Sequence, residues 1–116
     1  MQDLTLVIPA KYESESLPIF LDEISNLDCK KLIVLESSDE ETINSINRFK
    51  NIEILYQKNS GYGSALLEGV NFTKTKFFCI INADGSMNPD YLENMLYHVK
   101  NENLDFLFAS RYEKPN

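Results

Sequence analysis

Hydrophobic residues occur along this chain in short, nearly uninterrupted runs, and polar turn residues follow each run. Pro9 follows the first run, and the carboxylate of Asp84 follows the fourth. Runs that are apolar at successive positions are typical of strands buried on both faces of a parallel sheet. The predicted strands cover residues 4–8, 31–35, 52–56, 76–82 and 105–110.

Between these runs, apolar residues recur at helical spacing. Residues 17–24 follow the i, i+3, i+4, i+7 pattern, and Ser14 or Ser16 is the expected N-cap. Gly69 weakens the third helix by about 1 kcal/mol relative to alanine, and a glycine in such a place usually permits close packing. The predicted helices run from Ser14 or Ser16 to 24, from 40 to about 49, from 64 to about 72, and from 88 to 100.

The alternation of strands and helices predicts an α/β fold, a three-layer α/β/α sandwich with a mostly parallel Rossmann-like sheet. Ligands of such sheets bind beyond the carboxyl ends of the strands, where the strand order reverses. Functional side chains are therefore expected in the segments that follow strands, which are residues 9–13, 36–39 and 82–86.

Composition narrows the class of ligand. With 116 residues, 43% of them apolar, the chain suits a single domain with a real core. A formal charge of -7, with no basic cluster beyond Lys30 and Lys31, argues against nucleic acid as a partner. An acidic protein that binds a phosphorylated ligand usually needs a divalent cation.

Three further features indicate the compartment. Cys79 lies within an apolar run far from Cys29, which favours free thiols and a reducing environment. No run approaches the roughly 20 apolar residues of a membrane span, and the first residues lack the features of a signal peptide. We therefore expect a cytoplasmic protein. Peripheral contact with the inner membrane face through a lipid-linked substrate is compatible with this location. His98 has no matching ligand nearby and receives no role.

The turns after the first two strands carry candidate nucleotide contacts. Tyr12 can stack on a base and Glu13 can hydrogen-bond a base or ribose, although an ordinary surface turn has the same composition. Glu36 begins a turn whose oxygens can accept a hydrogen bond from a base. The same turn is also ordinary helix-entry chemistry.

Two more segments have the composition of a phosphate site. Residues 59–63 contain Gly61 and Gly63 before a helix, so their amides can face a ribose or phosphate, or simply form a turn. This loop is neither a dinucleotide fingerprint nor a P-loop, because its third glycine and the Gly-Lys-Ser/Thr sequence are missing. Asn82 and Asp84 can supply one or two oxygens to Mg²⁺ or Mn²⁺, or form an Asx turn.

Taken in order, these segments resemble the family 2 glycosyltransferases of the GT-A fold, especially polyprenyl-phosphate mannose or glucose synthases. Residues 4–13 look like the family's opening strand and Pro-Ala-Tyr-Asn-Glu turn, and residues 59–66 are similar to its Asn-x-Gly-x-Gly-x-Ala segment. In residues 32–42, Glu36 falls on the second acid of the family's Asp-Asp-Gly-Ser turn. Asn82-Ala83-Asp84 occupies the D-x-D position, and residues 110–112 look like the Gly-Ser-Arg turn.

The resemblance implies a nucleotide-diphosphate sugar donor, UDP- or GDP-linked, with Mg²⁺ or Mn²⁺ as cofactor. The implied reaction is inverting transfer of a hexose to an acceptor such as a polyprenyl phosphate or glycan. It leaves the catalytic residues unknown. The implied donor contacts are Pro9, Tyr12, Glu13, Glu36, Gly61, Gly63 and Ala83, the metal ligands Asp84 and Asn82, and the phosphate or acceptor contacts Ser86 and Arg111.

Three departures from the family pattern shape the expectation. Asn82 keeps an oxygen but loses a charge, the turn at Glu36 lacks the glycine, and the sequence stops soon after Arg111. We therefore expect residues 1–116 to be one nucleotide-sugar-binding GT-A-like domain without the acceptor-binding part. It acts with a partner chain or a second copy, or it is a catalytically lapsed nucleotide-sugar-binding module. A receiver-like domain fits poorly, because Pro9 and Ala10 stand where such a domain needs an acidic pair.

Overall fold

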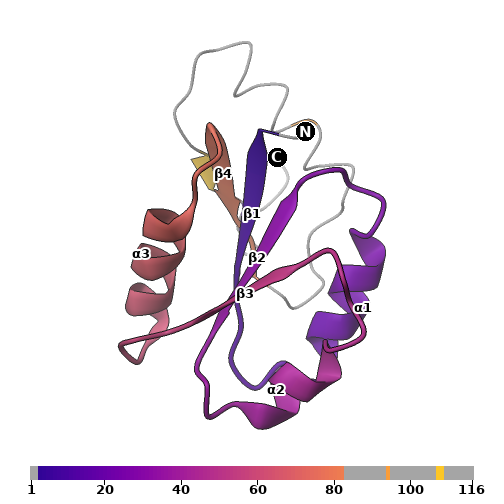
Figure 1. The fold of residues 1–116 in the computed structure, drawn as a ribbon, viewed down its shortest axis with the longest axis vertical. Helices are drawn as coiled ribbons and strands as arrows, with labels where there is room; N and C mark the ends of the chain where they lie inside the picture. The colour runs from indigo at the N-terminus through magenta and orange to yellow at the C-terminus, as the bar shows by residue number, and fades with distance from the viewer. Residues whose placement is uncertain (1–2, 83–93, 95–106, 109–116) are drawn as a thin grey trace, which may run out of the picture.

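A five-stranded parallel sheet forms the centre of the protein (Figure 1). The computed structural model describes residues 3–82, 94 and 107–108. The strand order is β3-β2-β1-β4-β5, and every neighbouring pair is parallel. The strands are β1 (Leu4–Pro9), β2 (Lys30–Leu35), β3 (Glu53–Tyr56), β4 (Phe77–Ile80) and β5 (Leu107–Phe108).

Helices cover both faces of this sheet. The helices α1 (Ser16–Glu23) and α2 (Glu40–Ser45) lie on one face, and α3 (Tyr62–Phe72) lies on the other (Figure 1). The chain moves from β1 outward to β3, and α3 then returns it to the opposite side of β1. The predicted three-layer α/β/α sandwich with a parallel Rossmann-like sheet is confirmed, and its strand order reverses at β1.

The two faces of the sheet bury separate hydrophobic clusters. In β1, Leu6 and Ile8 belong to the cluster under α1 and α2, whereas Val7 belongs to the cluster under α3. Successive side chains of a strand point to opposite faces, so a strand covered on both sides must be apolar throughout. This requirement explains the uninterrupted apolar runs in the sequence.

The helix ends differ from the expectation. Neither Ser14 nor Ser16 caps α1, whose N-cap residue is Glu15 without a side-chain capping bond. The hydroxyl of Ser16 instead donates to the carboxylate of Glu13. Helix α2 ends at Ser45 rather than near residue 49, and α3 begins at Tyr62, two residues before the expected start. In the predicted helix 88–100 only residue 94 is described, and it is helical, whereas His98 lies outside the described residues.

Neither Cys29 nor Cys79 forms a disulfide, as expected. Cys79 is buried in β4, and partial burial raises the pKa of the Cys29 thiol. Within the described ranges, no helix is long and apolar enough to cross a bilayer.

Candidate functional site

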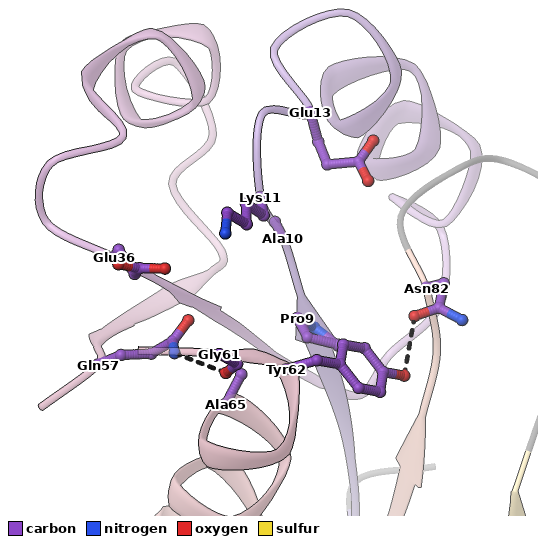
Figure 2. Close-up of a pocket in the computed structure, with 10 residues that line it drawn as sticks. All are labelled: Pro9, Ala10, Lys11, Glu13, Glu36, Gln57, Gly61, Tyr62, Ala65 and Asn82. Atoms are coloured by element: carbon purple, nitrogen blue, oxygen red, sulfur yellow. Dashed lines mark hydrogen bonds between the residues drawn. The ribbon is translucent and has the colours of Figure 1, made fainter. Parts of the chain in front are cut away.

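A cavity of about 130 Å³ opens at the carboxyl edge of the sheet (Figure 2). It lies where β1, β2 and β4 end, which is the point of strand-order reversal that favours ligand binding in open α/β sheets. The turn after β3 and the first turns of α3 complete its wall. The lining residues are Pro9, Ala10, Lys11, Glu13, Glu36, Gln57, Gly61, Tyr62, Ala65 and Asn82.

The turn after β1 is held by the start of α2. Tyr12 has a φ of 55°, a left-handed conformation that is rare for a bulky side chain. Its backbone N–H donates to the Asp39 carboxylate at 2.7 Å, and the N–H of Glu13 donates to the Thr42 hydroxyl at 3.0 Å. Asp39 and Thr42 are both buried. A pair of buried side chains from α2 therefore fixes the backbone of this turn.

The fixed turn presents two side chains to the cavity and one to solvent. Lys11 and Glu13 line the cavity, whereas the Tyr12 ring is 79% exposed and does not line it. The Lys11 ammonium lies 5.7 Å from the centroid of the Tyr12 ring, within cation–π range. The ring thus lies within interaction range of the charge of a cavity residue.

The glycine loop before α3 is fixed by its own polar contacts. The Gln57 amide donates to the carbonyl oxygens of Asn59 and Gly61, at 3.0 and 3.1 Å. The Glu68 carboxylate accepts the backbone N–H groups of Lys58 and Asn59. Gly61, the N-cap of α3, has a φ of 102°, which strains any residue with a Cβ. The loop is therefore shaped before any ligand binds.

Further hydrogen bonds connect this loop to the neighbouring strand ends. The Ser60 hydroxyl donates to the Glu36 carboxylate at 3.3 Å, after β2. The Tyr62 hydroxyl donates to the side-chain oxygen of Asn82 at 3.2 Å, after β4 (Figure 2). The loop, β2 and β4 thus hold one another in place around the cavity.

The cavity brings together five residues of the expected donor and metal site. They are Pro9, Glu13, Glu36, Gly61 and Asn82. Tyr12 and Gly63 lie close by in the chain but do not line the cavity. Ala83, Asp84, Ser86 and Arg111 lie outside the described residues.

Five lining residues had no individual contact assigned from the sequence, although Ala10 and Lys11 lie in the expected segment 9–13. They are Ala10, Lys11, Gln57, Tyr62 and Ala65. A residue-level signal existed for Lys11, because residues 9–13 matched to Pro-Ala-Tyr-Asn-Glu place Lys11 on the tyrosine and Tyr12 on the asparagine. Asparagine is enriched in left-handed conformations, which agrees with the φ of Tyr12.

The donor set can be compared with the ligands that a hard cation prefers. Mg²⁺ and Mn²⁺ favour carboxylate, carbonyl and water oxygens. The side-chain oxygen of Asn82 has a second lone pair besides the one that Tyr62 uses. Among residues 3–82 and the few described beyond them, no three His, Cys, Asp or Glu side chains form a metal-binding group. This part of the chain can therefore contribute one ligand, the side-chain oxygen of Asn82, to a bound cation.

Comparison with known proteins identifies the family. The sequence model of the family described as "Glycosyl transferase family 2" matches residues 5–116, almost the whole chain. The chain belongs to this family, and its parallel α/β architecture agrees with a GT-A domain.

The relatives are also glycosyltransferases by name. The chain is 32% identical over 93 residues to glycosyltransferases of Mycobacterium tuberculosis and Mycobacterium bovis, which covers 80% of this chain and 42% of each relative. It is 35% identical over 57 residues to EpsH of Bacillus subtilis, which its name assigns to the glycosyltransferases. This match covers 49% of this chain and 16% of EpsH. The chain thus spans about two fifths of the length of the mycobacterial relatives.

Proposed function

We propose that the carboxyl-edge cavity binds the nucleoside diphosphate of a nucleotide-sugar donor. The observation that carries this proposal is the convergence of Pro9, Glu13, Glu36, Gly61 and Asn82 on one cavity at the strand-order reversal. These residues come from four separate segments that the family resemblance had connected to the donor. Family 2 membership supports a sugar nucleotide as the ligand class.

The chemistry of the cavity supports an assignment of its two ends. Glu36 offers carboxylate oxygens to the N–H groups of a base, with Ser60 donating to one of those oxygens. The first N–H groups of α3 have no partner within the helix and receive no capping bond from Gly61, and this end carries the positive end of the helix dipole, which favours a diphosphate. Asn82 lies beside this end through its bond to Tyr62. We place the nucleoside toward Glu36 and the diphosphate toward Tyr62 and Asn82.

The proposed reaction is hexosyl transfer with inversion. An acceptor oxygen forms a bond to the anomeric carbon while the bond from that carbon to the diphosphate oxygen breaks, and the nucleoside diphosphate leaves with the bonding electrons. Asn82, with Asp84 beyond the described residues, is the proposed ligand pair for Mg²⁺ or Mn²⁺. A bound divalent cation neutralises charge that develops on the leaving diphosphate. No described residue is proposed as the catalytic base.

Acceptor and location are extensions of the same proposal. A polyprenyl phosphate or a glycan is the proposed acceptor class, and a lipid-linked acceptor would bring a cytoplasmic protein to the membrane surface. We propose that residues 1–116 supply the donor site and that a further region, a partner chain or a second copy supplies the acceptor contacts.

A second candidate function is nucleotide-sugar binding without turnover. The observation in its favour is Asn82, a neutral side chain at a D-x-D position, whose oxygen is engaged by the Tyr62 hydroxyl. A neutral ligand attracts a cation less strongly than a carboxylate. Release of hexose to a polyprenyl phosphate or to water by the purified protein would favour transfer over binding alone.

Calorimetric titration with UDP-glucose and GDP-mannose, each with and without Mn²⁺, tests the donor proposal. We expect saturable binding of at least one donor, strengthened by Mn²⁺. An absence of binding heat for both donors and for UDP and GDP, with metal present and at several temperatures, would overturn it. Adenosine, which lacks the diphosphate, is the control ligand.

Asn82→Asp is expected to increase the Mn²⁺-dependent part of donor affinity about tenfold, because a second carboxylate adds charge at the metal position. Asp84→Ala should remove the metal-dependent part. The measurement is the ratio of donor Kd without and with Mn²⁺ for each variant. An unchanged ratio in Asp84→Ala would show that Asp84 is not the ligand.

A further inference from the structure

The nucleoside end of the cavity carries two opposite charges that do not pair with each other. Lys11 and Glu36 both line it, and Figure 2 shows the Lys11 amino group and the Glu36 carboxylate at the same end, away from Asn82. Within the described part of the chain, the ion pair that forms is Asp22–Arg48, between α1 and the exposed segment that follows α2. Lys11 and Glu36 are therefore more than 4 Å apart and are both available to a ligand.

We infer that Lys11 is a specificity-determining residue for the nucleobase. It donates to the carbonyl of an oxo base, uracil or guanine, while Glu36 accepts the adjacent ring N–H. This inference rests on the proposed donor site. It adds a residue, Lys11, to which the resemblance assigned no contact, and a physical reason for the preference for uracil or guanine.

The hydrogen-bond donors and acceptors of Lys11 and Glu36 support the choice of an oxo base. An ammonium can only donate and an ionised carboxylate can only accept. Uracil and guanine place a carbonyl oxygen next to a ring N–H, whereas cytosine and adenine place an amino group next to a bare ring nitrogen. In the same orientation, an amino base would turn its donors toward Lys11 and its lone pair toward Glu36. Guanine has a second donor, its amino group, beside the ring N–H. The other oxygen of the Glu36 carboxylate can accept a hydrogen bond from this amino group.

The surroundings of Lys11 make it suitable for a positioned contact. An exposed lysine normally loses side-chain entropy when it is ordered, which weakens any contact it makes. Here the Tyr12 ring lies 5.7 Å from the ammonium, and the Tyr12 backbone is itself fixed by the bond to Asp39. Part of the ordering is therefore already built into the free protein, which favours ligand affinity.

The test compares UDP, GDP, CDP and ADP, which share a diphosphate, by calorimetry in the presence of Mn²⁺. We expect the wild-type chain to bind UDP or GDP at least about tenfold more tightly than CDP and ADP, since an amino base would leave polar groups of the site facing groups with which they cannot pair. Lys11→Met keeps an unbranched side chain, one atom shorter, and removes its charge and its hydrogen-bond donors. We expect it to reduce the preference to about threefold or less, mainly by weakening the oxo nucleotide.

Two controls separate base recognition from general attraction. Lys58→Met removes an exposed lysine of the neighbouring loop that does not line the cavity, and it should leave the preference unchanged. Inorganic pyrophosphate with Mn²⁺ should bind wild type and Lys11→Met equally.

The outcomes distinguish the inference from the proposed function. If Lys11→Met weakens all four nucleotides and pyrophosphate by the same factor, Lys11 attracts phosphate and the inference is overturned. If wild type binds the four nucleotides equally, the inference fails and the donor site stands. If wild type binds none of them, both fail.

Discussion

Replacing Gly69 by alanine is expected to lower the free energy of unfolding by about 1–3 kcal/mol, the usual range for overpacking a core. A Cβ at this position would lie 2.6 Å from Cγ1 of Val7 and 3.0 Å from Cγ2 of Val34. Both valines belong to the cluster between α3 and the sheet, so the helix or the strands must shift. Alanine is the better helix former by about 1 kcal/mol, which offsets only part of this cost.

Urea denaturation of wild type and Gly69→Ala measures the effect. Gly63→Ala is the matched control, because it lies in the same helix and its added Cβ would meet nothing within 4 Å. We expect this control to be as stable as wild type or more stable by up to about 1 kcal/mol. In the Gly69→Ala background, Val7→Ala should cost less than it does alone. Equal stability of Gly69→Ala and Gly63→Ala would contradict the described packing of α3 on β1 and β2.

Asp39→Ala is expected to destabilise the protein by about 1–3 kcal/mol and to weaken donor binding about tenfold or more. The substitution leaves the Tyr12 N–H without its acceptor at 2.7 Å, in a backbone conformation that tyrosine rarely adopts. Once released, the turn can relax toward an ordinary conformation. Lys11 and Glu13 then leave the positions that line the cavity.

Three further variants isolate this cause. Asp39→Asn keeps an oxygen that can accept the Tyr12 N–H, so it should retain most of the stability and the donor affinity. Tyr12→Gly accommodates the left-handed φ, so Asp39→Ala should destabilise less in the Tyr12→Gly background than alone. Unfolding in urea and calorimetric affinity for UDP and GDP are the two readouts. An Asp39→Ala variant with unchanged affinity for both nucleotides would contradict the positioning role of Asp39.

The sequence predicted the sheet well because a strand that is buried on both faces has a recognisable pattern in its local sequence. A strand such as β2 must be apolar at successive positions, and its apolar run marks it within one residue. The local sequence indicates the ends of the helices less clearly. Helix α1 has no side-chain cap, and α2 is only six residues long. Their ends are set by tertiary contacts, such as the bond from the Glu13 backbone to Thr42, rather than by local sequence.

The edge of the sheet that carries the cavity was also predictable, because parallel strands end together. The particular side chains were less so. Within residues 9–13 the resemblance assigned a ligand contact to Tyr12 and none to Lys11, but the structure places Lys11 on the cavity and the Tyr12 ring beside it. This exchange depends on the φ of Tyr12, which is fixed by Asp39, a residue 27 positions away. Contacts over such separations cannot be derived from a local pattern.

Gln57 and Tyr62 illustrate the same limit. Each lines the cavity because of a hydrogen bond that closes the glycine loop, Gln57 to the carbonyl of Gly61 and Tyr62 to Asn82. Neither residue type in a loop or a first helical turn indicates a ligand. Their positions followed only from the three-dimensional arrangement of the strand ends.

Mapping donor binding on the backbone amides tests the central claim most directly, and a chain of 13.4 kDa is small enough for nitrogen-15 NMR. We predict that UDP or GDP with Mg²⁺, which is diamagnetic, shifts the amide signals of residues 10–13, 36, 57–62 and 82. Signals of the outer surface of α1, such as Ile19, should not move. Shifts confined to other surfaces, with the cavity residues unchanged, would contradict the assignment of this cavity as the donor site.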